Sequence, residues 1–319
     1  MDVSLTPMQR RTVSSLLGDG TGATFDPDLP EHLRAYLESG IADVVQGHRI
    51  RLSKERLNDL ERCEGSFAAT LAGERPPFEP TARNAVGVLL HGALEADAAS
   101  PVEEDPEALV VAACEGLAAD RRFGPFWSDL GTGARALIAA DALAGLELFR
   151  ASFPPLGPAR RLLAPTAERW VGASLAGGQV TLSGRIDLMV GRFEPRRATR
   201  VLVDLKTGAA WPEHAEDMRL YALLFTLRFG VPPLRVASFF LRSGECQPEE
   251  VSERVLRRSA DRVIHAVRTA ARLAVDGGDG PTLRPGPHCE WCPRRQRCPA
   301  ARAASGLGSP PPQAPLQPA

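Results

Sequence analysis

The chain has 319 residues, of which 44% are hydrophobic and 24% charged, so it can build one large core or two modest ones. The chain has 38 lysines and arginines and 39 aspartates and glutamates, which gives a formal net charge of -1. This near-balance argues against a protein that binds polyanions through overall positive charge alone. No apolar run reaches the roughly 20 residues of a membrane span, and the first residues lack the pattern of a secretory signal. We therefore expect a cytoplasmic protein with no membrane partner.

The first half of the chain predicts helices. Residues 1–52 are rich in Gly, Pro and Asp and predict a partly helical preface. A helical pattern begins at Ser53, and a second begins near Thr81, where apolar residues recur at helical spacing. Further Ala- and Leu-rich stretches predict a helical insertion at about residues 100–155.

Short β-prone runs separated by turn residues begin after the insertion. They predict an antiparallel meander of three strands, then a helix, a strand and a long helix, at about residues 168–175, 179–190, 199–207, 214–230, 234–241 and 251–275. Together with the helix before the insertion, this order predicts one α/β domain over residues 53–300 with helices on a mixed sheet. The Pro-rich residues 301–319 predict a disordered tail.

Charged residues interrupt two of the predicted strands. Asp204 and Lys206 are two residues apart in VLVDLKTG, so both side chains project from the same face of the strand. Asp187 stands between apolar neighbours in the preceding strand. If the two strands pair, the two carboxylates can converge on one hard cation such as Mg²⁺ or Mn²⁺, with Lys206 beside it. The alternative is two acids at strand ends, one of them in a surface ion pair with Lys206.

The spacing of these residues resembles a known family. Asp187 in G-R-I-D, then sixteen residues, then Asp204-Leu-Lys206-Thr-Gly resembles the active-site core of the PD-(D/E)XK nuclease superfamily, closest to its RecB- and AddB-like branch. The resemblance covers about residues 53–300. It implies a restriction-endonuclease-like core and a deoxyribonuclease that uses Mg²⁺ or Mn²⁺ to hydrolyse phosphodiester bonds in DNA repair, recombination or defence. It implies Asp187, Asp204 and Lys206 as catalytic residues, and as metal ligands His91, Asp187, Asp204 and the Leu205 carbonyl.

Two helices add to the resemblance. Gly87 and His91 resemble the G-x-x-x-H helix of RecB-like nucleases, whose histidine is a metal ligand. The helix after Lys206 usually carries Q-x-x-x-Y in the family. This chain retains the tyrosine, as Tyr221, but has Asp217 in place of the glutamine. Tyr221 is a candidate to stack on a DNA base, or a packing residue of an apolar helix. Glu168 is a candidate accessory acid, although a solvated position on its strand is the more ordinary one.

Three of the six cysteines are clustered, as Cys289-x2-Cys292-x5-Cys298. Six cysteines are too few for a disulfide scaffold in a chain of this length, and the cluster indicates a metal centre that needs a fourth ligand. Cys63 is the candidate, because its surroundings resemble the N-terminal cysteine segment of iron–sulfur nucleases in this branch. The resemblance implies a [4Fe–4S] cluster that staples the two ends of the domain together.

Alternatives remain open at the cysteines and for the function. A zinc site that includes His288 is the alternative to the iron–sulfur cluster. Arg294 and Arg295 lie between the cysteines and are candidates for DNA phosphate contacts, or solvated charges. The expected partner is DNA with single strands or free ends. Because the chain lacks the G-x-x-x-x-G-K-[ST] loop, it would either use a helicase or another nucleic-acid-processing partner or act on ends that are already unwound. The alternative functions are a catalytically inactive DNA-binding module with this fold and a zinc-stapled interaction protein.

Overall fold

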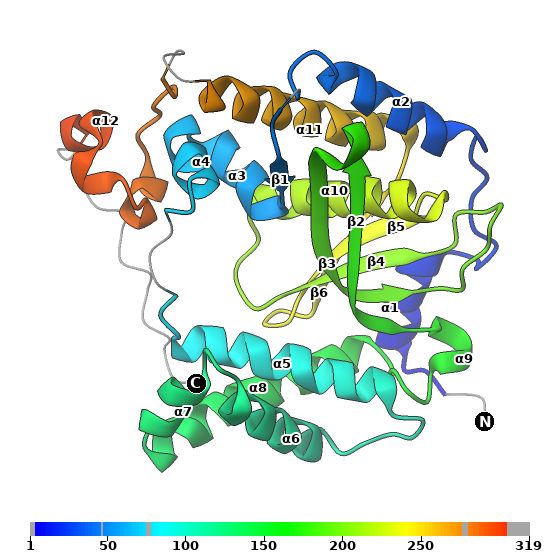
Figure 1. Ribbon diagram of the computed structural model, residues 1–319. Helices are drawn as coiled ribbons and strands as arrows, with labels where there is room; N and C mark the ends of the chain where they lie inside the picture. Colours follow the sequence, from blue (N-terminus) through cyan, green and yellow to red (C-terminus); the bar gives the residue numbers. More distant parts are fainter. Residues whose placement is uncertain (1–3, 46, 75–77, 276–279, 305–319) are drawn as a thin grey trace.

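A mixed six-stranded sheet forms the centre of the computed structural model, which describes residues 4–45, 47–74, 78–275 and 280–304 (Figure 1). The strand order is β1-β3-β4-β5-β6, and β2 pairs with β3 outside this path. The strands are β1 (Ile50–Leu52), β2 (Thr166–Leu175), β3 (Val180–Val190), β4 (Val201–Lys206), β5 (Arg235–Phe240) and β6 (Glu245–Glu250).

The meander predicted from the sequence is present. β2 is antiparallel to β3 along nearly its whole length, and β3 is antiparallel to β4, with Leu188 opposite Val203. β4 and β5 are parallel, which makes the sheet mixed. The sequence analysis missed β1, which is three residues long and runs parallel to β3, and β6, whose sequence ECQPEE carries little apolar signal. Both are edge strands of the path.

Helices cover both faces of the sheet and bury an apolar core on each (Figure 1). One core includes residues of α2 (Leu29–Ile41), α3 (Lys54–Arg62), α4 (Glu64–Leu71), α10 (Pro212–Phe229) and α11 (Glu253–Ala274). The other includes residues of α1 (Pro7–Leu17), α5 (Ala82–Ala99), α6 (Pro106–Ala119), α7 (Gly124–Asp129), α8 (Thr132–Ser152) and α9 (Arg160–Leu163). The two helices of the expected preface therefore pack into the same cores as the rest of the domain.

Cys63 divides the helix that was predicted from Ser53. Its backbone is extended, with φ -169° and ψ 128°, so the residue ends α3 and begins α4. The side chain of Cys63 is buried. The break places this thiol at the corner between two helices, near the segment that carries the other three clustered cysteines (Figure 1).

The insertion forms α6, α7 and α8, of which α6 and α8 pack against α5 (Figure 1). α8 also reaches the sheet, since the ring of its Phe149 lies 5.4 Å from that of Phe239 in β5. α5 begins where the Thr81 hydroxyl accepts a hydrogen bond from the Asn84 backbone N–H at 3.2 Å. The apolar side chains of α5 are buried in the same core as residues of the insertion and of the sheet, and His91 lies near the centre of α5.

The C-terminal segment is built from short turns. It contains the 3₁₀ helices η2 (Pro287–Trp291) and η3 (Arg295–Arg297) and the helix α12 (Pro299–Ala303), and a further 3₁₀ helix, η1 (Ala176–Gly178), joins β2 to β3. α12 overlaps the start of the expected tail, of which residues 305–319 lie outside the described residues. Within the described parts of the chain, no helix combines the length and apolar character needed to cross a membrane.

Candidate active site

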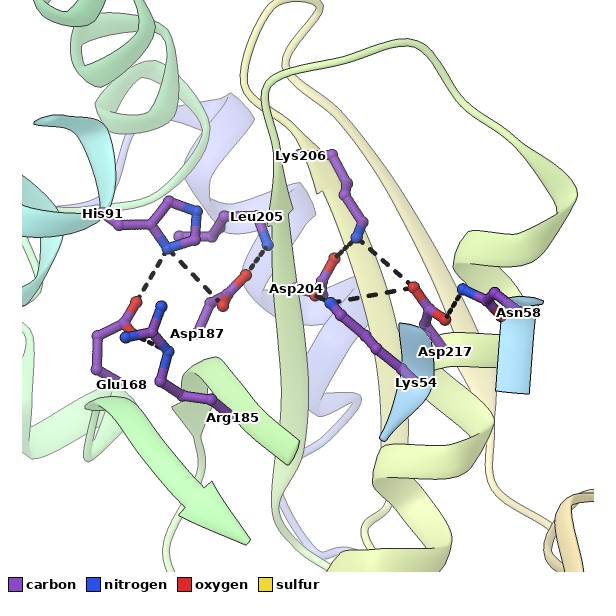
Figure 2. Close-up of polar contacts among 10 residues, drawn as sticks. All are labelled: Lys54, Asn58, His91, Glu168, Arg185, Asp187, Asp204, Leu205, Lys206 and Asp217. Carbon is purple, nitrogen blue, oxygen red and sulfur yellow. Dashed lines mark hydrogen bonds and ion pairs between the residues drawn. The ribbon is translucent and has the colours of Figure 1, made fainter. Parts of the chain in front are cut away.

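His91, Glu168 and Asp187 form a tight group of ligand-type side chains. They come from α5, β2 and β3, and their nearest ligand atoms all lie within 4.8 Å of one another. The His91 Nδ1 atom is 2.9 Å from Glu168 Oε1 and 3.7 Å from Asp187 Oδ1. Figure 2 shows the three side chains together on one side of β4. The side chains of both acids are only about a tenth exposed.

β4 holds Asp187 through its backbone. The Leu205 N–H donates a hydrogen bond to Asp187 Oδ2 at 2.8 Å, and Arg185 Nε lies 2.8 Å from Glu168 Oε2 (Figure 2). The acids of this group are therefore fixed from two strands. The expected role of the Leu205 carbonyl as a metal ligand stays a prediction, because the contact in the structure is made by the Leu205 N–H.

Asp204 lies on the other side of β4, between two lysines. Asp204 is 1% exposed, with Lys206 Nζ at 2.6 Å from its Oδ2 and Lys54 Nζ at 3.5 Å from its Oδ1. The carboxylate of Asp217, from α10, is 4.0 Å from each lysine. Figure 2 shows this second cluster next to the first, with β4 between them. Asp204 does not belong to the tight His91 group, and its role as a metal ligand stays a prediction.

Tyr221 is a packing residue. It is 2% exposed, and the Lys54 ammonium lies 5.3 Å from the centre of its ring. Gly184 in β3 leaves room for the ring, since a Cβ at that position would come within 2.4 Å of it. A buried ring cannot stack on a base of DNA, so the stacking role expected of Tyr221 is wrong for this structure.

The charges of the two clusters act on one another. Burial alone would raise the pKa of Asp204, but the neighbouring Lys206 and Lys54 hold that pKa below its usual value. Burial raises the pKa of Asp217, and its contacts with Lys54 oppose this. Burial alone would lower the pKa of His91, but its hydrogen bond to an adjacent carboxylate raises that pKa above its usual value.

Asp187 gives the site a dependence on pH. Burial, followed by the charge of Asp204, raises the pKa of Asp187 from 3.8 to about 6. Between these values the folded protein binds a proton that the unfolded chain has lost, so the free energy of unfolding of the metal-free protein falls as the pH rises from about 4 to about 6. We expect the stabilisation by Mn²⁺ to grow over the same range, because the cation competes with this proton. Thermal unfolding at stepped pH, with Mn²⁺ or with EDTA, measures both trends, and Asp187→Asn should remove them.

The donor set fits a hard divalent cation. One imidazole and two carboxylates are suitable ligands for Mn²⁺, and carboxylates are preferred by Mg²⁺. Glu168 Oε2 and Asp204 Oδ2 are buried oxygens, and each lies close to one cationic side chain, at 2.8 and 2.6 Å. Because a carboxylate oxygen has two lone pairs, each could still bind a cation in addition to this contact.

The sequence analysis missed two residues of the site. Glu168 was expected to be solvated, but its side chain is only 10% exposed and lies beside His91. Lys54 was not singled out at all. The available signal was composition, since lysine occurs only at positions 54 and 206 among the 38 basic residues of the chain. The other predicted residues, His91, Asp187, Asp204 and Lys206, lie in the two adjoining clusters.

The four cysteines singled out from the sequence line one cavity of about 420 Å³: Cys63, Cys289, Cys292 and Cys298. The sulfur of Cys63 accepts a hydrogen bond from the Arg284 N–H, and that of Cys289 accepts one from the Gly286 N–H, both at 3.4 Å. Burial, followed by the other three thiols, raises the pKa of Cys292. Among the described residues, no three of these sulfurs approach as closely as the ligand atoms of the His91 group.

The arginines of the cysteine segment differ in their contacts. Arg294 binds the carboxylate of Glu74 through two nitrogens, at 2.9 and 2.7 Å, and Arg297 binds the same carboxylate. Arg295 is exposed at the cavity. The pair with Glu74 gives Arg294 a structural role next to α4, and a DNA contact by Arg294 or Arg295 stays a prediction.

Comparisons with known proteins identify the family. No curated protein matches the chain. Among solved structures, a candidate exonuclease from Eubacterium rectale matches with a TM-score of 0.43 and 13% identity, covering 82% of this chain and 90% of its own. The protein SSO0001 matches with a TM-score of 0.30 and 16% identity, covering 67% of this chain and 95% of its own. The family model of the PD-(D/E)XK nuclease superfamily matches residues 51–299, which include both clusters of the site. Because this match spans most of the sequence, the chain belongs to the PD-(D/E)XK nuclease superfamily.

Proposed function

We propose that this protein is a metal-dependent deoxyribonuclease, similar to RecB-family exonucleases, that hydrolyses phosphodiester bonds. The observation that carries the proposal is the half-buried group of His91, Glu168 and Asp187 directly beside the Asp204–Lys206 pair. Shielding this many ionisable side chains from water costs folding free energy. Clusters of partly buried ionisable side chains are therefore concentrated at catalytic sites, where their function offsets that cost.

Each cluster has a distinct task in this proposal. His91 and Asp187, with Glu168 and Asp204 next to them, hold Mg²⁺ or Mn²⁺. The ion supplies Lewis-acid stabilisation of the scissile phosphate and makes a water molecule more acidic. Lys206 orients the attacking water and stabilises the negative charge that develops on the phosphate oxygens. Burial strengthens these electrostatic effects, because little water screens them.

The substrate that we propose is DNA with single-stranded or free ends, processed in repair, recombination or defence. The chain lacks a phosphate-binding loop of the G-x-x-x-x-G-K-[ST] type, so we propose that it either acts on ends that are already unwound or receives them from a helicase partner. We propose a cytoplasmic location, where thiols stay reduced and available to a metal.

Cleavage of labelled DNA tests the function. Purified protein is incubated with end-labelled single-stranded and duplex oligonucleotides, with Mn²⁺ or with EDTA. We expect shortened products in Mn²⁺ and none in EDTA, and the ladder of products distinguishes exonuclease from endonuclease action. A protein that binds the oligonucleotide but never shortens it would contradict the proposal and favour the inactive DNA-binding module.

We also propose that Cys63, Cys289, Cys292 and Cys298 ligate a [4Fe–4S] cluster. Their shared cavity and the N–H groups directed at two of the sulfurs support this, since hydrogen bonds to sulfur are a normal feature of such clusters. Residues 63 and 289 are far apart in the sequence, so a centre that joins them restricts the unfolded chain and stabilises the fold.

Anaerobic purification tests the cluster. We expect a coloured protein with about four irons and matching sulfide per chain. Cys292→Ala should lose the iron and become poorly soluble, because the staple is lost, whereas Cys114→Ala, which lies outside the cavity, should keep both iron and solubility. A colourless wild type that contains zinc would refute the iron–sulfur assignment.

A further inference from the structure

Both lysines of the chain lie in the active site. The sequence contains 36 arginines and only two lysines, Lys54 and Lys206. Both ammonium groups approach the same carboxylate, that of Asp204, at 3.5 and 2.6 Å. An ammonium is a compact charge with rotatable donors, whereas a guanidinium is a wide planar fork. A chain that otherwise uses arginine keeps lysine at these two positions, which indicates that the site requires a compact cation twice.

Asp217 balances the second lysine. Its Oδ2 atom is 4.0 Å from both Lys54 Nζ and Lys206 Nζ, and Asp217 is 4% exposed. The cluster thus contains two carboxylates and two ammonium groups, which make a neutral set. An uncompensated ammonium in this half-buried cluster would be costly, and Asp217 reduces that cost. The acid that departs from the family's Q-x-x-x-Y pattern therefore has a definite partner.

α3 and α11 fix this arrangement. Lys54 is the first residue of α3, and Asn58 follows one turn later on the same face. The Asn58 side-chain N–H donates to Asp217 Oδ1 at 2.9 Å, while Asn58 Oδ1 accepts from Arg262 of α11 at 2.6 Å. Asp217 is held in place, whereas the side chain of Lys54 remains 23% exposed and can meet a ligand.

We propose that Lys54 binds a phosphate group of the DNA strand in the ground state, distinct from the transition-state role of Lys206, and that Asp217 is its counter-ion. The inference rests on the proposed function, since it names how that site binds DNA. When Asp204 binds a divalent cation, Asp217 is the one remaining carboxylate for Lys54 and Lys206 in this cluster. The two lysines then carry one positive charge more than Asp217 balances, which matches the single negative charge of a phosphodiester group. Lys54 then contacts a phosphate oxygen of the bound strand.

Thermal unfolding tests the pairing of Lys54 with Asp217, whether or not the protein cuts DNA. Lys54→Met leaves an excess of negative charge and Asp217→Asn an excess of positive charge, so we expect each to lower Tm by several degrees. The double variant restores the balance between positive and negative charges in the cluster, so its Tm should lie within about 2 °C of the wild-type Tm. Losses that simply add in the double variant would overturn the pairing.

DNA binding tests the phosphate contact. Affinity for a single-stranded oligonucleotide is measured in Ca²⁺ at several salt concentrations. We expect Lys54→Met and the double variant to bind about tenfold more weakly, with a slope of log K against log salt reduced by about 0.7, the value for one phosphate contact on a single strand. Arg228→Met, at the exposed far end of α10, is the control and should keep the wild-type slope.

The double variant separates a phosphate contact from a change of charge balance. It is as neutral as the wild-type set but lacks the Lys54 ammonium, so wild-type affinity and slope in this variant would overturn the role of Lys54. Cleavage in Mn²⁺ by the wild type is scored separately. A wild type that binds but does not cut refutes the proposed function, while the salt slopes still decide the role of Lys54.

Discussion

Lys206→Ala is expected to reduce the rate of DNA cleavage by about 10²–10³-fold or more, while DNA affinity changes little. The Lys206 ammonium is 2.6 Å from Asp204 and only 16% exposed, so it acts in surroundings where charge is poorly screened. Its contribution belongs to the transition state, in which negative charge accumulates on the phosphate oxygens. The ground state of the bound strand carries less of that charge, which is why binding should survive.

Single-turnover cleavage and a separate binding titration distinguish these effects. Arg228→Met serves as the control for the loss of a basic residue outside the site and should cleave at the wild-type rate. Lys206→Ala also unbalances the buried charges around Asp204, so its Tm is measured in parallel. An unchanged cleavage rate in folded Lys206→Ala would refute the catalytic assignment of Lys206.

Asp187→Asn is expected to abolish the stabilisation that Mn²⁺ gives to the folded protein. A ligand at 100 times its Kd stabilises a protein by about 2.7 kcal/mol, and a variant that cannot bind the ion gains nothing. Asp187 faces His91 at 3.7 Å and is anchored by the Leu205 N–H at 2.8 Å, so the amide keeps the shape of the site while it removes the charge. The difference in Tm with and without Mn²⁺ is the measurement.

Two further variants calibrate this result. Asp141→Asn changes an exposed acid of α8 and should keep the full response to Mn²⁺. Glu168→Gln should weaken the response, because Glu168 contributes a carboxylate to the same group. A wild-type response to Mn²⁺ in Asp187→Asn would show that the ion binds elsewhere.

Much of the fold could be predicted because its elements have clear periodicity. The β-prone runs around Asp187 and Asp204 predicted the meander, and the apolar periodicity after Thr81 predicted the helix that carries His91. β1 and β6 were not predicted, because β1 is very short and β6 is polar. Both strands form because they pair with neighbouring strands, which is a tertiary effect.

The site was harder to predict than the fold because its contacts join distant segments. Glu168 meets His91 across 77 positions of the chain, and Asn58 meets Asp217 across 159. No local pattern encodes such contacts. The charged positions of two strands pointed to Asp187, Asp204 and Lys206, and the family resemblance added His91. Neither carried information about Lys54, whose importance becomes visible only when its partners are seen in three dimensions.

Mn²⁺-dependent cleavage of an end-labelled oligonucleotide, compared between the wild type and Asp187→Asn, tests most directly whether the group of His91, Glu168 and Asp187 is a nuclease metal site. We predict rapid shortening by the wild type, none in EDTA, and none by the variant at any Mn²⁺ concentration. Equal cleavage by the wild type and the folded variant, or cleavage that persists in EDTA, would contradict the account.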